Sequence, residues 1–309
     1  MTDISARLGS MALRTCVFNA AGPKDVTLDE LETIGKSRAS AIVMKSCTLE
    51  PRQGNEEPRY SDVEKGSINS MGLPNLGYRE YVKFADALKK HGKPVIASVS
   101  GLCTADNVEI IKSFNDSPVD AIELNLSCPN IKGKPQIGYD FAQMDEVLRE
   151  TTKMCKKPIG VKLPPYFDFV HFEEAARILK KHNPAFITCI NSIGNALVID
   201  ADKESTVIRP KGGFGGLGGA YIKPTALANA RKFYELTGGK IPIVGVGGVF
   251  TGRDAFEFIL AGATAVQIGT AFMQEGAGVF ERVADELMLL LKTKGYDSLD
   301  DFRGKLKTC

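Results

Sequence analysis

Short apolar runs alternate with amphipathic stretches along the whole chain. Each run is rich in valine and isoleucine and apolar on both faces, which is typical of parallel strands covered by helices. We therefore predict eight strands, at residues 16–21, 41–45, 94–99, 121–126, 159–163, 186–191, 241–246 and 265–269. Apolar residues at helical spacing follow each strand, and we predict eight helices, at residues 27–35, 78–90, 105–114, 141–156, 172–181, 225–236, 253–261 and 279–294.

The regular alternation of strand and helix predicts the fold class. Eight βα units in succession favour an α/β protein built as a single (β/α)8 TIM barrel over an open doubly wound sheet. No Gly-x-Gly-x-x-Gly opens a helix after the first strand, which argues against a dinucleotide-binding sheet. Asp140 and Thr251 precede predicted helices as start signals. We see no domain boundary, so we predict one domain over residues 1–309, with long loops covering the C-terminal face of the barrel.

Two predicted connections are too long for plain turns. Residues 46–77 follow the second strand and residues 192–223 follow the sixth, so both emerge at the C-terminal face. Long connections without regular structure usually cover or build a site. Residues 67–75 carry Asn69 and Asn75, which have no periodic role. Either these side chains form ordinary turns, or they recognise a planar amide or carboxylate ligand.

Composition narrows the classes of partner. Hydrophobic residues make up 43% of the chain and charged residues 25%, which is ordinary for a globular enzyme. The formal net charge is +2 and no long basic run occurs, so we expect no nucleic-acid partner. No run of about 18 apolar residues occurs either, so we expect no membrane span.

The spacing of cysteines and histidines bears on metals and on the compartment. The seven cysteines form no Cys-x-x-Cys pair and the three histidines form no His-x-x-x-His pair, so we expect no metal site. The cysteine count is odd and no signal peptide is recognisable. Both observations favour reduced thiols and a cytoplasmic location.

Glycines cluster after the last three predicted strands, at residues 212–219, 245–248 and 269. Backbone N–H groups approach a phosphate closely where side chains are missing. Taken singly, each cluster is better explained by a tight turn. Three clusters on one side of one barrel favour a bound phosphate, because the loops after strands seven and eight commonly hold one with a short extra helix. We predict that helix at residues 270–274, and flavin mononucleotide (FMN) as the ligand.

The segment Glu123-Leu-Asn-Leu-Ser-Cys-Pro-Asn130 places two amides and a thiol where a buried strand gives way to a loop. A lone cysteine is usually a small buried hydrophobe. Cys128, however, is followed by a proline and by nearby lysines in a loop, which favours a reactive thiolate. No histidine is placed to pair with it, so we interpret Cys128 as a general base rather than as an acyl-transfer nucleophile. Cys47, beside Lys45, is the alternative thiol.

Lysines stand at two otherwise apolar strand ends, Lys45 and Lys162, where an unpaired ammonium group is costly. One interpretation is that they reach the rim of the barrel or form an ion pair with Glu123. The functional interpretation is that the two cations face an anionic ligand and a reduced cofactor.

Together these motifs resemble the dihydroorotate dehydrogenase family, specifically its soluble, fumarate-linked class 1A. The strongest pieces, spread over nearly the whole chain, are Lys45-Ser-Cys-Thr, Gly66-Ser-Ile-Asn-Ser-Met-Gly-Leu-Pro-Asn, Glu123-Leu-Asn-Leu-Ser-Cys-Pro-Asn, Gly133-Lys-Pro-Gln, Val161-Lys-Leu-Pro-Pro-Tyr-Phe-Asp and Phe214-Gly-Gly-Leu-Gly-Gly. The resemblance implies a homodimeric FMN enzyme that oxidises (S)-dihydroorotate to orotate in pyrimidine (UMP) synthesis. It also implies that fumarate then enters the same pocket and leaves as succinate.

The resemblance implies a role for each matching residue. Cys128 is the base that removes the C5 proton, and the loop at residues 129–139 closes over the substrate. The pyrimidine is held by Lys45, Asn69, Ser70, Met71, Gly72, Leu73, Asn125, Asn130, Asn191 and Ser192. FMN is held by Ala21, Gly22, Lys45, Ser46, Asn125, Lys162, Ile190, Gly219, Gly247, Gly248, Gly269 and Thr270.

Alternatives stay open at this point. One is the NAD-linked class 1B catalytic subunit, which works with an iron–sulfur and FAD partner subunit, although its loops differ from residues 67–75 here. Another is an FMN-free barrel enzyme that uses the same loops to bind a sugar phosphate. A catalytically silent binding protein fits least well, because it would not require two lysines and a thiol around one pocket.

Overall fold

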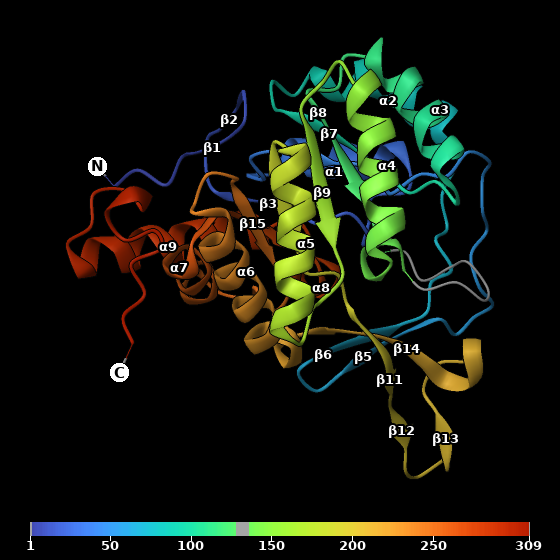
Figure 1. Ribbon diagram of the computed structural model, residues 1–309. Coiled ribbons are helices and arrows are strands. Elements are labelled where there is room, and N and C mark those ends of the chain that lie inside the picture. Colours follow the sequence, from blue (N-terminus) through green and yellow to red (C-terminus); the bar gives the residue numbers. More distant parts are fainter. Residues whose placement is uncertain (1, 128–135, 309) are drawn as a thin grey trace.

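The computed structural model describes residues 2–127 and 136–308. At its centre, eight parallel strands form one sheet in the order β3-β16-β15-β10-β9-β8-β7-β4, with helices outside it (Figure 1). The predicted α/β barrel is therefore confirmed. The barrel strands are β3 (Val17–Asn19), β4 (Ile42–Val43), β7 (Val95–Val99), β8 (Ala121–Asn125), β9 (Ile159–Leu163), β10 (Phe186–Cys189), β15 (Ile243–Val246) and β16 (Ala263–Ile268).

The barrel is closed between β3 and β4, which stand at the two ends of the sheet order. Ser40 N donates to Val17 O at 2.9 Å. Further along, the side chain of Asn19 spans the gap, because its Nδ2 donates to Val43 O at 2.8 Å and its Oδ1 accepts from Val43 N at 2.8 Å. Asn19 is fully buried. A side-chain amide thus replaces one pair of hydrogen bonds of the backbone ladder.

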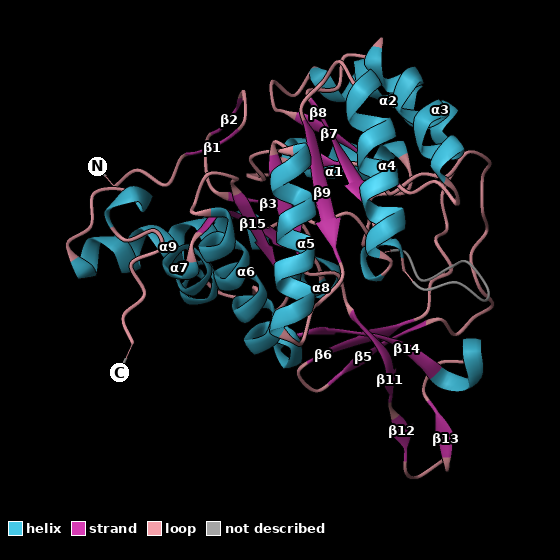
Figure 2. Ribbon diagram, viewed as in Figure 1, coloured by secondary structure: helices cyan, strands magenta, loops and turns pink. Residues whose placement is uncertain are grey.

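Each barrel strand is followed by a helix on the outside (Figure 2). The predicted start signals act as N-caps, since Asp140 accepts from Gln143 N at 3.0 Å and Thr251 accepts from Asp254 N at 3.2 Å. The predicted extra helix after the last strand is also present, as α8. The helices are α1 (Leu28–Lys36), α2 (Tyr78–Lys89), α3 (Thr104–Asn115), α4 (Phe141–Met154), α5 (Phe169–His182), α6 (Lys223–Thr237), α7 (Gly252–Ala261), α8 (Thr270–Glu275) and α9 (Val279–Lys294).

Helix α5 begins earlier than the predicted range, residues 172–181. Its N-cap is Asp168, whose Oδ1 accepts from His171 N at 2.9 Å. The first turn carries Phe169 and Val170, which are 67% and 72% exposed. These exposed apolar side chains hide the amphipathic pattern that marked the rest of the helix.

The two long connections form an accessory sheet. Its strands β5 (Tyr60–Val63), β6 (Gly66–Asn69), β11 (Ile193–Leu197) and β14 (Phe214–Gly219) pair antiparallel in the order β11-β14-β6-β5. A hairpin of β12 (Ile199–Asp200) and β13 (Ser205–Thr206) extends beyond it (Figure 2). From the sequence, both connections were predicted to be loops without regular structure. The strands have no clear signal in the sequence. The run from 214 to 219, which forms β14, is mostly glycine and shows no alternation of apolar and polar residues.

A hairpin near the N-terminus lies at the other end of the barrel. Strand β1 (Ala6–Leu8) pairs with β2 (Met11–Leu13). Leu8 and Leu13 are buried, and an added Cβ at the turn residue Gly9 would lie 3.5 Å from Ala185 Cβ, just before β10. The hairpin therefore covers the N-terminal face. Over the described ranges, no helix is long and apolar enough to span a bilayer.

Candidate active site

A cavity of about 670 Å³, here called the main cavity, is lined by residues that follow the barrel strands and by residues of the accessory sheet. Cys128 and Asn130, and most of the loop at 129–139, lie outside the described residues. All other residues to which the resemblance gives a ligand-binding role line this one cavity. They are Ala21, Gly22, Lys45, Ser46, Asn69, Ser70, Met71, Gly72, Leu73, Asn125, Lys162, Ile190, Asn191, Ser192, Gly219, Gly247, Gly248, Gly269 and Thr270.

Lys45 follows β4 and points its ammonium group across the first βα loop. Its Nζ donates to Gly22 O and lies 3.6 Å from Asp25 Oδ1, and its side chain is 6% exposed. Asp25 is fully buried and accepts a hydrogen bond from Gly22 N at 2.6 Å. Burial raises the pKa of Asp25 to about 6, although the Lys45 charge opposes that shift. The sequence analysis did not single out Asp25, which lies in a loop with no motif around it.

Lys162, on β9, is the second buried cation at the cavity. Its Nζ donates to Ala21 O at 3.4 Å and forms no ion pair with any described residue. Burial lowers the pKa of Lys162, and the negative charges of Glu123 and Asp25 oppose that shift. Glu123 instead accepts hydrogen bonds from Thr188 Oγ1 at 2.7 Å and Gln267 Nε2 at 3.1 Å.

The alternative of an ion pair with Glu123 is therefore wrong for both lysines. Lys45 pairs with Asp25, and Lys162 lines the main cavity with its ammonium group incompletely hydrogen-bonded. A buried ammonium group with one long hydrogen bond is ready to donate to an acceptor on a ligand.

Three of the amide side chains that line the cavity are held by hydrogen bonds. Asn69 Nδ2 donates to Gly216 O at 3.2 Å, and Asn191 Nδ2 donates to Ser127 O at 3.2 Å. Asn125 Nδ2 donates to Ser46 Oγ at 3.1 Å. Asn69 and Asn191 can present both a donor and an acceptor to a planar polar ligand. Asn125 can present only its remaining N–H, because its Oδ1 already accepts from Ser127 N at 3.0 Å and from Ser127 Oγ at 2.7 Å.

Asn75 has a structural role instead of a ligand-binding one. Its Oδ1 accepts from Gly77 N at 2.9 Å, its Nδ2 donates to Leu73 O at 2.9 Å, and it does not line the cavity. Its bond to Leu73 supports a backbone turn in which Gly72 has φ 74° and Leu73 has φ 60°. A bulky residue in this region is strained, and such strain persists where the surroundings fix the backbone. Asn75 thus supports the stretch predicted to face the substrate.

Glycines form a side-chain-free wall of the cavity. Gly219, at φ 88°, pairs with Gly66 so closely that an added Cβ would lie 2.2 Å from Gly66 Cα. At Gly248, φ 79°, a Cβ would lie 2.7 Å from Lys223 Cβ. The third glycine segment leads directly into α8, which begins at Thr270. This wall of exposed backbone suits a phosphate group.

The rival thiol is excluded by its burial. Cys47 is fully buried, and its Sγ donates to Ser98 O at 3.3 Å. Burial raises the pKa of Cys47 far above its usual range, so the thiol stays protonated at neutral pH. In the part of the chain that the structure describes, no group of three or more His, Cys, Asp or Glu side chains could hold a metal ion.

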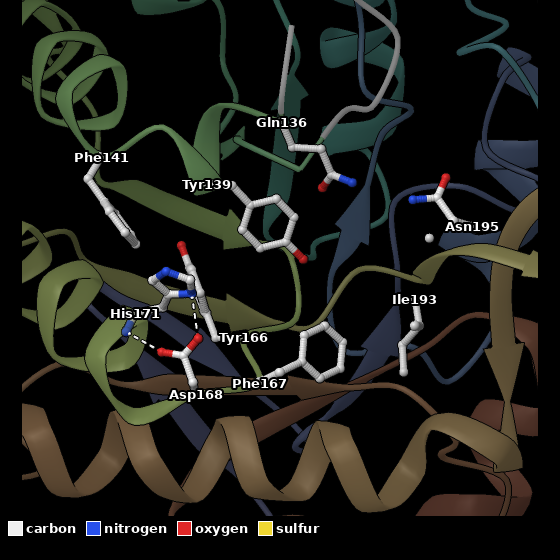
Figure 3. Close-up of a pocket in the computed structure, with 10 residues that line it drawn as sticks. Gln136, Tyr139, Phe141, Tyr166, Phe167, Asp168, His171, Ile193 and Asn195 are labelled. Atoms are coloured by element: carbon white, nitrogen blue, oxygen red, sulfur yellow. Dashed lines mark hydrogen bonds and ion pairs between the residues drawn. The ribbon is translucent and has the colours of Figure 1, made fainter.

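A second cavity of about 420 Å³, here called the side cavity, adjoins the main one (Figure 3). Several aromatic rings line it, and it shares Gln136, Tyr139, Gly194 and Asn195 with the main cavity. Tyr139 OH donates to Pro165 O at 2.6 Å, which fixes that ring between the two spaces. Of the shared residues, only Gln136 lay in a motif that the sequence analysis used. Tyr139 ends the loop at residues 129–139, which the resemblance implied would close over the substrate, and Gly194 and Asn195 lie on β11, where no sequence pattern marks a site.

The fold and the cavity together define an α/β-barrel protein whose C-terminal face carries a cavity lined by two buried lysines and several amide side chains. The chain belongs to the dihydroorotate dehydrogenase family, whose model matches residues 5–291. A Streptococcus pyogenes serotype M1 protein named "Putative dihydroorotate dehydrogenase A (fumarate)" is 52% identical over 310 residues, covering 99% of each chain. An Enterococcus faecalis protein named "Probable dihydroorotate dehydrogenase A (fumarate)" is 50% identical over 308 residues, again covering 99% of each.

A solved structure supports the same fold. The crystal structure of DHODH from Eimeria tenella in complex with ferulenol matches with a TM-score of 0.84. The match covers 98% of this chain and 88% of that chain at 20% sequence identity. At this identity the likeness establishes the barrel architecture alone.

Proposed function

We propose that the protein is a fumarate-linked dihydroorotate dehydrogenase, which oxidises (S)-dihydroorotate to orotate and returns the electrons to fumarate. The observation that carries this proposal is the main cavity, where two buried lysines, three held amides and a glycine wall meet. The relatives at about 50% identity carry the same activity in their names over the full length of the chain.

The family is flavin-dependent, and the residues present fit FMN. Gly219 and Gly248 line the main cavity and pack too closely against neighbouring residues to carry a Cβ, so they offer backbone rather than side chains to a ligand, which suits the phosphate. Lys162 has an ammonium group able to donate to the N1–O2 edge of the ring, where it would stabilise negative charge. When bound, FMN supplies the hydride acceptor of the reaction. The complete proposed set is Ala21, Gly22, Lys45, Ser46, Asn125, Lys162, Ile190, Gly219, Gly247, Gly248, Gly269 and Thr270.

The amide side chains and Lys45 would hold the pyrimidine. Lys45 attracts its carboxylate, and the amides of Asn69, Asn125 and Asn191 match its C=O and N–H edge. Met71, Gly72 and Leu73, with Ser70 and Ser192, shape the remaining wall. Cys128 removes the C5 proton while hydride leaves C6, and Asn130 completes the amide set; both assignments rest on the resemblance. Fumarate binds at the same place because it also offers a conjugated system with a carboxylate.

Three further properties are part of the proposal and rest on the class 1A resemblance. We propose that residues 1–309 act as one FMN-binding barrel domain. We also propose that the protein is a cytoplasmic homodimer, and that it acts without a metal, a membrane or a nucleic acid.

Anaerobic visible spectroscopy of the purified protein tests the function. We expect a flavin band that bleaches with dihydroorotate and returns when fumarate alone is added. Bleaching that returns only with NAD and an iron–sulfur partner subunit would place the protein in the NAD-linked class. A protein that neither contains nor takes up FMN would contradict the proposal and favour a sugar-phosphate enzyme.

A further inference from the structure

Asp25 lies directly behind the cation that faces the main cavity. Lys45 and Gly22 line the cavity, whereas Asp25 does not line it and is fully buried. One carboxylate oxygen of Asp25 accepts from Gly22 N at 2.6 Å, and the other lies 3.6 Å from Lys45 Nζ. Asp25 therefore touches both a predicted cofactor contact and a predicted substrate contact, while it has no surface from which to touch a ligand itself.

The second oxygen of Asp25 is incompletely satisfied. Oδ1 accepts no hydrogen bond from any residue within the described ranges, so the Lys45 charge is its main compensation. Lys45 Nζ in turn donates to Gly22 O. The ammonium group is thus drawn toward the loop behind the cavity. An anionic ligand in the cavity must compete with Asp25 for that charge.

We propose that Asp25 is a positioning residue, which holds the Lys45 ammonium group and competes for it with the substrate carboxylate, so that anions bind more tightly when Asp25 is protonated. This inference rests on the proposed function, because it takes Lys45 as the contact for the pyrimidine carboxylate. Asp25 acts only through Lys45 and through the backbone of Gly22.

The direction of the effect follows from the charges around Asp25. Burial already raises its pKa to about 6, and Lys45 lowers it. A bound anion that draws Lys45 away raises the pKa further, so binding takes up a proton. Affinity for an anion then falls as the pH rises through about 6, by about tenfold for each pKa unit gained on binding. The groups that face Asp25 from the surrounding elements are Gly22 N, Lys45, Lys162, Glu30 of α1 and Tyr81 of α2.

The test is a titration of the FMN-loaded protein with orotate, followed by the shift of the flavin spectrum between about pH 5 and 8. In the wild type we expect the Kd for orotate to rise about tenfold over this range. In Asp25→Asn we expect the Kd to be independent of pH and close to the low-pH value of the wild type. Equal pH dependence in both proteins would overturn the proposal.

Asp120→Asn is the matched control. Asp120 also accepts from one lysine, Lys89 Nζ at 2.7 Å, and from one backbone amide, Val95 N at 2.7 Å. It precedes β8 at the opposite face of the barrel, so its replacement perturbs stability without touching the cavity. We expect Asp120→Asn to keep the pH dependence of the wild type.

A second measurement needs no variant. Calorimetry of orotate binding to the wild type in buffers of different ionisation enthalpy, at about pH 6.5, measures protons taken up on binding. We expect uptake of a fraction of one proton per site, and no uptake would overturn the proposal even if Asp25→Asn fails to fold. A wild type that shows no flavin band or no response to orotate would contradict the proposed function instead.

Discussion

At the scale of single residues, the thiol at position 128 carries the proposed proton transfer. Replacing Cys128 with alanine removes the base, so we expect flavin reduction by dihydroorotate to slow by roughly 10²–10⁴-fold while FMN stays bound. Cys47→Ala is the control, because that thiol is buried with no access to the cavity. It should lose about 1 kcal/mol of stability and reduce at the wild-type rate. Stopped-flow absorbance measures the rate of flavin reduction in both variants. Reduction at the wild-type rate in Cys128→Ala would exclude Cys128 as the base.

Replacing Lys162 tests whether the main cavity binds FMN. Its buried ammonium group forms no ion pair within the described part of the chain, so methionine, with similar volume, removes a desolvation penalty. We expect the FMN-free Lys162→Met protein to be as stable as the wild type or about 1 kcal/mol more stable. Its FMN affinity should fall roughly 10- to 100-fold, because a charge-assisted hydrogen bond is lost. Thermal unfolding with and without FMN separates the two effects. A less stable apoprotein with unchanged FMN affinity would assign Lys162 a structural role.

At the scale of elements, Asn19 closes the barrel between β3 and β4. Its removal leaves a buried N–H and a buried C=O of Val43 unpaired, so Asn19→Ala should lower the unfolding free energy by about 3 kcal/mol. Asn115 bridges Met154 O and Lys156 N in the same way but is only half-buried. Asn115→Ala should therefore lose less than about 1 kcal/mol, since water replaces its bonds. Denaturant unfolding compares the two variants, and equal losses would argue against a closing role.

The accessory sheet depends on a close approach of two glycines. In Gly219→Ala, the new Cβ would meet Gly66 Cα at a backbone position with φ 88°. We expect a loss of about 3 kcal/mol and weaker FMN binding, because β14 must separate from β6. Gly212→Ala places alanine at φ 65° with open space around it, so it should lose about 1 kcal/mol and keep FMN. FMN affinity that is unchanged in Gly219→Ala would show that the glycine wall is not part of the cofactor site.

Helices and strands whose apolar residues recur at a regular spacing could be predicted from the sequence. Elements that depend on contacts with distant parts of the chain could not. The spacing of apolar residues predicted α9 with the bounds that the structure has, since one face of a long helix must be buried. Strand β14 has almost no side chains to show a period, and it is a strand only because β6 and β11 pair with it. Strand β4 is shorter than predicted because an Asn19 side chain, not backbone, continues its pairing. No local pattern carries that information.

At the scale of the whole molecule, the site residues are distant in the sequence and become neighbours only in the folded barrel. The resemblance implied the ligand-binding residues from the first to the last barrel strand, and the meeting of the carboxyl ends of parallel strands at one face predicted where they would gather. The structure places every described member there. Asp25 escaped prediction because its importance lies in what it touches, a lysine distant in the chain, and it stands in no motif. Tyr139 ends the predicted loop at residues 129–139, but nothing in the sequence signals its hydrogen bond to Pro165 O.

Two carboxyl groups give the whole molecule opposite responses to pH. Burial raises the folded-state pKa of Asp25 from 3.8 to about 6, so the folded apoprotein loses stability as the pH rises between these values. Hydrogen bonds from Lys181 and His182 lower the folded-state pKa of Asp145 from 3.8 to about 2. The ionised Asp145 therefore stabilises the folded protein. This stabilisation is complete above about pH 4 and is lost as the pH falls toward 2.

Comparing variants with the wild type isolates each group. As the pH rises from about 4 to 6, Asp25→Asn apoprotein should gain roughly 2–3 kcal/mol relative to the wild type, because only the wild type must bury the ionised carboxylate. The unfolding free energy of Asp145→Asn should instead fall below that of the wild type as the pH rises from about 2 to 4. The difference between the two proteins should stay constant above about pH 4. Denaturant unfolding of the FMN-free proteins across these windows measures both differences. If the unfolding free energies of Asp25→Asn and the wild type change equally with pH, Asp25 is already ionised at pH 4. The charge of Lys45 would then outweigh the effect of burial on the pKa of the Asp25 carboxyl group.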